Sequence, residues 1–124
     1  MGTAARSSWS PDRADIITLH PASHSAAARL PVQALLVCST RGFNERTGIV
    51  IGFPLTNVEA NADNPLALRL TRPTGEIGYV LAFQPKSFDW RSRKAQPHAW
   101  GGGHVAALRA ALRKLDAICG VTER

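Results

Sequence analysis

The segment Lys86-Ser87-Phe88-Asp89-Trp90-Arg91-Ser92-Arg93 places aromatic and cationic side chains within one short stretch of the chain. Aromatic faces stack on unpaired bases and cations neutralise phosphates, so this mixture is typical of proteins that bind single-stranded nucleic acid. A second interpretation places Phe88 and Trp90 in the core or in a dimer interface, with the cations merely solvated. The composition of the segment leaves both interpretations open.

Other candidate sites are weaker. Gly101-Gly102-Gly103 precedes a helical pattern, and helix N-termini bind phosphate, but the spacing of a nucleotide fingerprint is missing and a plain linker is favoured. His20 and His24 lie in one long loop without a third ligand nearby, so they are expected to face solvent rather than to hold a metal. The sequence contains no Walker loop, GxSxG, HExxH or CxxC motif.

The positive charge of the chain is concentrated near its end. The net charge is +6; residues 1–85 carry seven basic and six acidic side chains, whereas residues 86–124 carry eight basic and three acidic ones. This asymmetry favours an anionic partner, either nucleic acid or an acidic protein segment. No apolar run approaches the roughly 20 residues that span a bilayer, and the start lacks a signal peptide. A cytoplasmic protein without a membrane partner is expected.

The elements that would position these residues are mostly short strands. Apolar and alternating runs predict strands at 15–19, 33–39, 49–53, 66–70 and 77–83. Residues 40–48 are expected to form a polar turn, 87–93 a helical turn or irregular piece, and 94–98 a short extended segment. Apolar spacing over 104–119, followed by Gly120, predicts an amphipathic helix with a glycine cap. The fold class is therefore mainly β (α+β), a small barrel with a C-terminal helix.

One domain is expected over residues 11–120, with a flexible lead-in at 1–10 and a short tail at 121–124. Several segments in this domain share an order and a residue pattern with one known family. They are Pro11-Asp12-Arg13-Ala14-Asp15-Ile16-Ile17, Leu35-Leu36-Val37-Cys38-Ser39, Phe43-Asn44-Glu45-Arg46-Thr47-Gly48, Phe53-Pro54-Leu55-Thr56, Gln84-Pro85-Lys86-Ser87-Phe88-Asp89-Trp90-Arg91-Ser92-Arg93 and Leu115-Asp116-Ala117-Ile118. With these segments the chain resembles the MazF/PemK family of toxin endoribonucleases from bacterial type II toxin–antitoxin systems.

The resemblance implies an SH3-like β-barrel that is usually a homodimer. It implies cleavage of single-stranded RNA, including mRNA, at short sequences without a metal or other cofactor. The ribose 2′-hydroxyl would attack the adjacent phosphorus and leave a 2′,3′-cyclic phosphate and a 5′-hydroxyl. The implied protein partner is a MazE/PemI-like antitoxin laid across the dimer groove, and the complex of toxin and antitoxin would bind DNA.

The site residues implied by the resemblance are named position by position. Thr56 matches the Thr of the family's Pro-x-Thr element and is the first catalytic candidate. The family's catalytic Arg position is occupied by Gln33, followed by Ala34, and Arg29 is the substitute candidate on the preceding loop. Candidate RNA-binding residues are Lys86, Trp90, Arg91, Arg93, Gln84 and His24, and His24 is also a candidate for acid–base chemistry.

Two further positions depart from the family pattern. Phe83 stands where the family has the acid of an Asp-Gln pair, and Thr18 stands where it has a Trp. The leading hypothesis is therefore an RNA-cleaving toxin, and the alternative is a degenerate member that binds RNA or an antitoxin without cleaving. A third class is a toxin of the same fold that binds a protein such as gyrase, which the Lys86–Arg93 match argues against.

Overall fold

The structure is a computed structural model that describes residues 9–21 and 32–120. Its elements, in chain order, are β1 (Ile16–Leu19), β2 (Gln33–Val37), α2 (Arg41–Thr47), β3 (Ile49–Thr56), the 3₁₀ turn η2 (Glu59–Asp63), β4 (Ala67–Thr71), β5 (Ile77–Leu81), β6 (Lys86–Asp89), β7 (Gln96–Pro97) and α3 (Val105–Cys119). Within these two ranges, no helix is long and apolar enough to cross a membrane.

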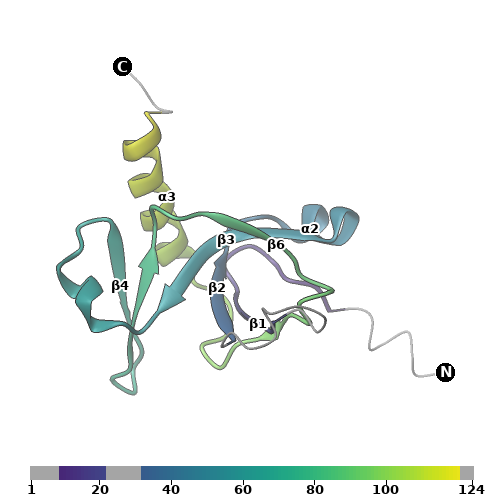
Figure 1. Cartoon of the computed structure of the whole chain (residues 1–124), viewed down its shortest axis with the longest axis horizontal. Coiled ribbons are helices and arrows are strands. Elements are labelled where there is room, and N and C mark those ends of the chain that lie inside the picture. Colours follow the sequence, from purple (N-terminus) through teal and green to yellow (C-terminus); the bar gives the residue numbers. More distant parts are fainter. Residues whose placement is uncertain (1–8, 22–31, 121–124) are drawn as a thin grey trace.

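All of the strands belong to one antiparallel sheet (Figure 1). The strand order is β4-β5-β3-β2-β1-β7, and β6 pairs with β3 outside this path. The predicted mainly β fold with a C-terminal helix is confirmed. The sheet is open rather than a closed barrel, because the path ends at β4 and β7 among the described strands.

The long strand β3 joins two parts of the sheet. Ile49–Gly52 pairs with β6, and Leu55 and Thr56 pair with β5. Pro54 lies between the stretch that pairs with β6 and the stretch that pairs with β5. Proline has no backbone N–H, and at this position no hydrogen bond to β5 or β6 is lost. The strand therefore runs on to Thr56, beyond the predicted end at residue 53. Gly52 is required here, because a Cβ at this position would lie 2.4 Å from the carbonyl oxygen of Leu36.

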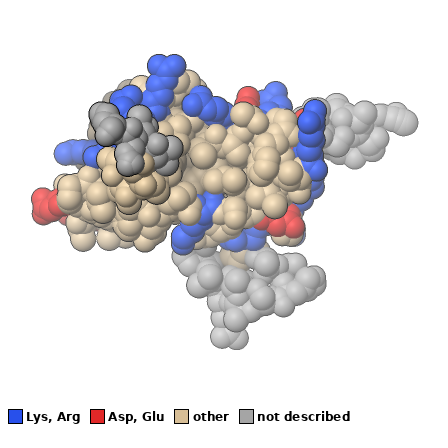
Figure 2. Space-filling model, turned by 90° about the horizontal axis from the view of Figure 1, so that it is seen from above, with Lys and Arg blue, Asp and Glu red and all other residues tan. Residues whose placement is uncertain are grey.

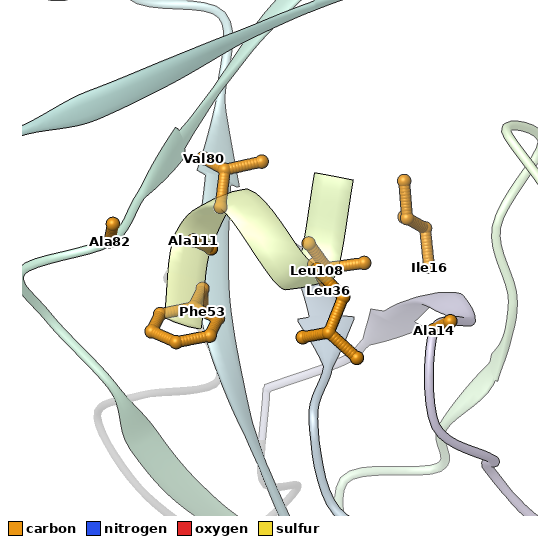
Figure 3. Packing of buried hydrophobic residues seen from close by; sticks show 8 residues of the cluster. All are labelled: Ala14, Ile16, Leu36, Phe53, Val80, Ala82, Leu108 and Ala111. Carbon is orange, nitrogen blue, oxygen red and sulfur yellow. The ribbon is translucent and has the colours of Figure 1, made fainter. Parts of the chain in front are cut away.

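Successive residues of β1 and β2 point to opposite faces of the sheet, and both faces are buried. Ile16 and Leu36 belong to a cluster on the face covered by α3, where Leu108 and Ala111 pack against the sheet (Figure 3). Ile17 and Leu35 belong to a second cluster on the other face, which includes Trp90. Residues in the middle of the sheet are thereby fixed on both sides.

The helix α3 begins and ends close to the predicted bounds. Gly120 caps it in the left-handed conformation, with φ of 71°, and its N–H donates to the carbonyl oxygen of Asp116. Leu108 is fully buried, whereas Val105 at the start of the predicted apolar stripe is 40% exposed. Only the middle of the stripe is therefore covered by the sheet in this chain.

Residues 40–48 contain a helix, α2, and the predicted polar turn is wrong. Thr40 caps its start by accepting a hydrogen bond from the N–H of Phe43, and Gly48 ends it with φ of 73°. Inside this helix the Asn44 side chain is fully buried; it donates to the carbonyl oxygen of Pro11 and accepts from the hydroxyl of Ser39. These bonds tie α2 to the edge of the sheet.

Two further predictions are corrected in part. Residues 87–93 were predicted as a helical turn or irregular piece; 87–89 instead belong to the strand β6, which pairs with β3, whereas 90–93 form a turn in which the N–H of Arg93 donates to the carbonyl oxygen of Asp89. Trp9, in the predicted flexible lead-in, packs edge-on against Trp90 with 6.1 Å between ring centroids, and Ser10 donates a hydrogen bond to Glu45. The packed part of the chain thus begins at Trp9 at the latest.

Candidate RNA-binding groove

A groove of about 970 Å³ crosses one side of the sheet. Its floor and walls come from β1, β2, β3 and β5, the turn before β6, and the segment after β7. The lining residues are Thr18, Val32, Gln33, Ala34, Pro54, Leu55, Thr56, Asn57, Arg72, Glu76, Ile77, Gly78, Leu81, Gln84, Lys86, His98, Ala99 and Trp100. The lining contains both polar and apolar residues, which suits a ligand that carries both bases and phosphates.

Thr56 lies at the end of β3 and lines this groove, as a catalytic candidate must. Its hydroxyl oxygen accepts a hydrogen bond from the N–H of Val58 at 3.2 Å. A hydroxyl can accept and donate at the same time, so Thr56 can still donate a hydrogen bond to a second group. The bond from Val58 restrains the side chain at the groove.

Gln33 begins β2 and also lines the groove, together with Thr18 on the neighbouring strand β1. Two of the positions that depart from the family pattern are thus groove residues. The third, Phe83, lies half-buried in the turn between β5 and β6 and is absent from the groove lining within the described residues.

Gln84 and Lys86 reach the same groove from the turn after β5 and from the first residue of β6. Both side chains are exposed. The structure therefore brings together sequence-predicted residues from two separate parts of the chain, Thr56 from one and Gln84 and Lys86 from the other. The ammonium of Lys86 provides a positive charge at the groove.

Trp90, predicted to stack on RNA, is instead a core residue with 7% of its surface exposed. Its indole N–H donates to the carbonyl oxygen of Asn44 at 2.8 Å, and the guanidinium of Arg91 lies 4.5 Å from its ring centroid. Packing against the protein occupies the ring, so it offers no face to a base. The second interpretation of the segment, with Trp90 in the core, is the one that the fold supports.

Arg91 lies in a different hollow of about 690 Å³, lined by Thr47, Gly48, Ile49, Ser87, Phe88, Asp89, Arg91 and Ser92. Its guanidinium donates to the carbonyl oxygen of Glu45 at 3.0 Å, near the end of α2. Among the described residues, none lines both this hollow and the groove. Arg91 is therefore not brought together with Thr56.

Arg93 is half-buried and its guanidinium is held by three groups of the protein. It donates through Nε to the carbonyl oxygen of His20 and through Nη2 to Oε1 of Gln33 at 2.7 Å, and it lies 5.1 Å from the ring centroid of Phe88. Within the described residues, Arg93 does not line the groove but bonds to Gln33, which does. The two loop candidates, Arg29 and His24, lie outside the described residues.

Sequence reasoning missed four groove residues: Arg72, Glu76, His98 and Trp100. Arg72 and Glu76 flank the turn between β4 and β5 and pair through Nη1 and Oε1 at 2.5 Å. Burial lowers the pKa of His98 below its usual value, the nearby Arg72 lowers it further, and Glu76 opposes the shift. Strand pairing over long sequence separations brings these side chains to the groove. No local sequence pattern therefore predicts that they line it.

Charges outside the groove are scattered. Figure 2 shows Lys and Arg side chains at several separate places on the viewed face, with a broad area of uncharged residues between them. Among residues 9–21 and 32–120, no three His, Cys, Asp or Glu side chains are grouped in a way that could hold a metal ion.

Comparison with known proteins agrees with this architecture. No protein-family model and no curated protein matches the chain. Among solved structures, a MazE–MazF complex from Deinococcus radiodurans (Form-II) has a TM-score of 0.75 and 25% sequence identity, covering 92% of this chain and 99% of that chain. MazF from the same organism (Form-I) has a TM-score of 0.74 and 26% identity, covering 91% and 99%. The chain therefore has the MazF-like toxin fold that its sequence predicted.

Proposed function

We propose that this protein is the toxin of a toxin–antitoxin pair and that it cleaves single-stranded RNA in the groove. The observation that carries the proposal is the meeting of Thr56, Gln33, Gln84 and Lys86 in one groove, although they are spread over more than fifty positions of the sequence. The MazF-like fold supports the same conclusion.

The proposed reaction is attack of a ribose 2′-hydroxyl on the adjacent phosphorus, which gives a 2′,3′-cyclic phosphate and a 5′-hydroxyl without a metal ion. Thr56 would donate a hydrogen bond from its hydroxyl to a non-bridging phosphate oxygen. The ammonium of Lys86 would offset the charge of the strand as it enters the groove. Such donors act most strongly where charge develops in the transition state.

Two residues that precede β2 in the sequence are added to the proposed site. Val32 lines the groove, and Arg29 lies three residues before it in the sequence. We assign to Arg29 the stabilisation of the phosphorane charge, and to His24 a contact with RNA and a share of the proton transfer.

The proposed protein partner is an antitoxin of the MazE type. MazF of Deinococcus radiodurans has been solved together with MazE, in complexes that resemble this chain over about nine-tenths of its length. An acidic antitoxin segment laid along the groove of a homodimer would cover Thr56 and Lys86 and so block RNA.

The test is cleavage of a long single-stranded RNA in the presence of EDTA, with mapping of 5′-hydroxyl ends. Discrete cuts are expected for the parent protein, and Thr56→Ala should reduce the rate by about 10²–10³-fold, as the loss of one transition-state donor does. Thr74→Ala, an exposed threonine of the β4–β5 turn outside the groove lining, is the matched control and should cut like the parent. Uncut RNA, or equal rates for the parent and Thr56→Ala, would contradict cleavage at this site.

The second candidate function is RNA or antitoxin binding without cleavage. It is favoured by one observation: an uncharged amide, Gln33, occupies the groove position where the resemblance implies an Arg. Retained, salt-sensitive RNA binding by a protein that makes no cuts would support this candidate. Loss of RNA binding as well would leave recognition of a protein partner.

A further inference from the structure

One end of the groove contains a cluster that the proposed cleavage chemistry does not use. Arg72 and Glu76 come from the β4–β5 turn, and His98 and Trp100 come from the segment that follows β7. The Arg72 guanidinium lies 5.5 Å from the ring centroid of Trp100, and the His98 and Trp100 rings are 6.4 Å apart at 69°. Two segments that are distant in sequence thus build one aromatic and polar wall.

The hydrogen bonding of His98 settles which ring nitrogen carries its proton. The backbone N–H of Trp100 donates to Nδ1 of His98 at 3.1 Å. A backbone amide can only donate, so Nδ1 must be unprotonated, and the neutral imidazole carries its proton on Nε2. Burial and the neighbouring Arg72 lower the pKa of His98, which keeps the ring neutral. His98 therefore offers the groove a neutral N–H donor.

Trp100 is fixed in place by contacts on several sides. Its carbonyl oxygen accepts a hydrogen bond from Nε2 of His104 at 2.8 Å. Its indole lies over Gly78 of β5, where an added Cβ would come within 3.2 Å of the ring. The missing side chain at Gly78 makes room for the indole, so the groove has a rigid, half-buried aromatic surface at this end.

We propose that Arg72, His98 and Trp100 form a subsite for one unpaired nucleobase of the RNA strand, in the same groove as Thr56. An unpaired base is recognised by stacking on an aromatic or guanidinium surface and by hydrogen bonds along its edge. Trp100 and Arg72 provide the stacking surface, the Nε2–H of His98 is a donor for a base oxygen or ring nitrogen, and the carboxylate of Glu76 is an acceptor for an amino group. The fixed pattern of donor and acceptor would select among the four bases.

This subsite rests on the proposed function for its place in an RNA strand, but its occupancy is measured without cleavage. The ring resonances of His98 are followed by NMR while the full chain is titrated with each of the four nucleoside 5′-monophosphates and with ribose 5-phosphate. The expected result is a shift of the His98 signals with one or two of the nucleotides and none with ribose 5-phosphate. Equal responses to all five compounds would show phosphate binding only and would overturn the subsite, as would no response.

Variants of His98 distinguish a role of its ring as a hydrogen-bond donor from a purely structural role. His98→Gln places an amide N–H near the position of Nε2 and should retain most of the affinity for the preferred nucleotide, whereas His98→Leu should lose about tenfold. The control is Arg113→Gln on the exposed side of α3, which should bind like the parent. If His98→Leu does not fold, a Gln variant that binds all four nucleotides alike would still overturn the assignment.

The cleavage assay gives an independent readout of the same subsite. If the parent protein cuts RNA, His98→Leu should broaden the base preference at one position of the cleavage motif, and Arg113→Gln should not. An unchanged motif in His98→Leu would contradict the subsite while leaving the proposed function intact. If the parent protein makes no cuts, the proposed cleavage fails, and the nucleotide titration alone decides the subsite.

Discussion

Arg93 donates a hydrogen bond from Nη2 to Oε1 of Gln33 at 2.7 Å, and this contact fixes what Gln33 can offer to the groove. A guanidinium has only donors, so Gln33 must turn its oxygen toward Arg93. The amide NH₂ of Gln33 is then left on the other side as a donor. The groove position at the start of β2 is thus an uncharged amide, and the cation bonded to it, Arg93, is not itself among the described residues that line the groove.

Replacing Gln33 by Glu tests how a negative charge at this position affects stability and RNA affinity. Gln33→Glu is nearly isosteric and should keep the bond to Arg93 as a charge-assisted pair, so the free energy of unfolding should stay within about 1 kcal/mol of the parent value. The added negative charge faces a groove that must accept phosphates, and RNA affinity should fall about tenfold. Urea unfolding and RNA binding at low salt measure the two quantities. Gln33→Leu, which loses the bond without adding charge, is the control; an equal loss of affinity in both variants would contradict the charge argument.

Trp90 variants should affect the fold rather than RNA. Trp90→Phe removes the indole N–H and leaves the buried carbonyl oxygen of Asn44 without that donor. This carbonyl oxygen still accepts from the N–H of Gly48, so the loss is that of one hydrogen bond, about 0.5–1.5 kcal/mol in unfolding free energy, measured by urea denaturation. RNA affinity should remain within about twofold, because the ring is covered by protein. A tenfold loss of affinity at unchanged stability would mean that Trp90 contacts RNA after all.

The sequence was most informative where the signal is local. Gly120 closes α3 as its position predicted, and the β4–β5 turn forms at Arg72-Pro73-Thr74-Gly75, residue types that are typical of turns, with Gly75 at φ of 97°. The helix α2 was missed although both of its signals were present, Thr40 before it and Gly48 after it. The polar composition of 40–48 favoured a turn. The segment is a helix that is held to the rest of the protein by one buried side chain, Asn44.

The candidate site was only partly predictable because its assembly depends on register. Trp90 and Asn44 are 46 positions apart, and no pattern in the segment 86–93 distinguishes an indole that bonds to a helix carbonyl from one that stacks on a base. His98 enters the groove because β7 pairs with β1, and Arg72 enters it because β5 pairs with β3. Thr56 was found through the resemblance, whereas Lys86 was already indicated by the mixture of aromatic and cationic residues in the segment 86–93.

Lys86 should contribute to RNA binding through charge alone. Lys86→Gln should weaken binding of single-stranded RNA and reduce the slope of log affinity against log salt by about 0.7, the value for one lost phosphate contact. The unfolding free energy should change by less than about 0.5 kcal/mol, because the side chain is exposed at the start of β6. Lys94→Gln, an exposed lysine outside the groove lining, is the matched control. Equal slopes for the two variants would place the RNA elsewhere on the protein.

The pH dependence of stability should contain a contribution from His98. Its pKa in the folded protein is lowered from the usual 6.5, first by burial and then by Arg72, with Glu76 acting in the opposite direction. Below about pH 6.5 the unfolded chain therefore binds more protons than the folded one. The contribution of neutral His98 to the free energy of unfolding is lost as the pH falls from there through the pKa of the folded protein. Urea unfolding at pH 7.5 and pH 5.0 should show a smaller drop for His98→Gln than for the parent. An NMR titration of the His98 ring checks the cause directly, and a pKa above 6.5 in the folded protein would contradict it.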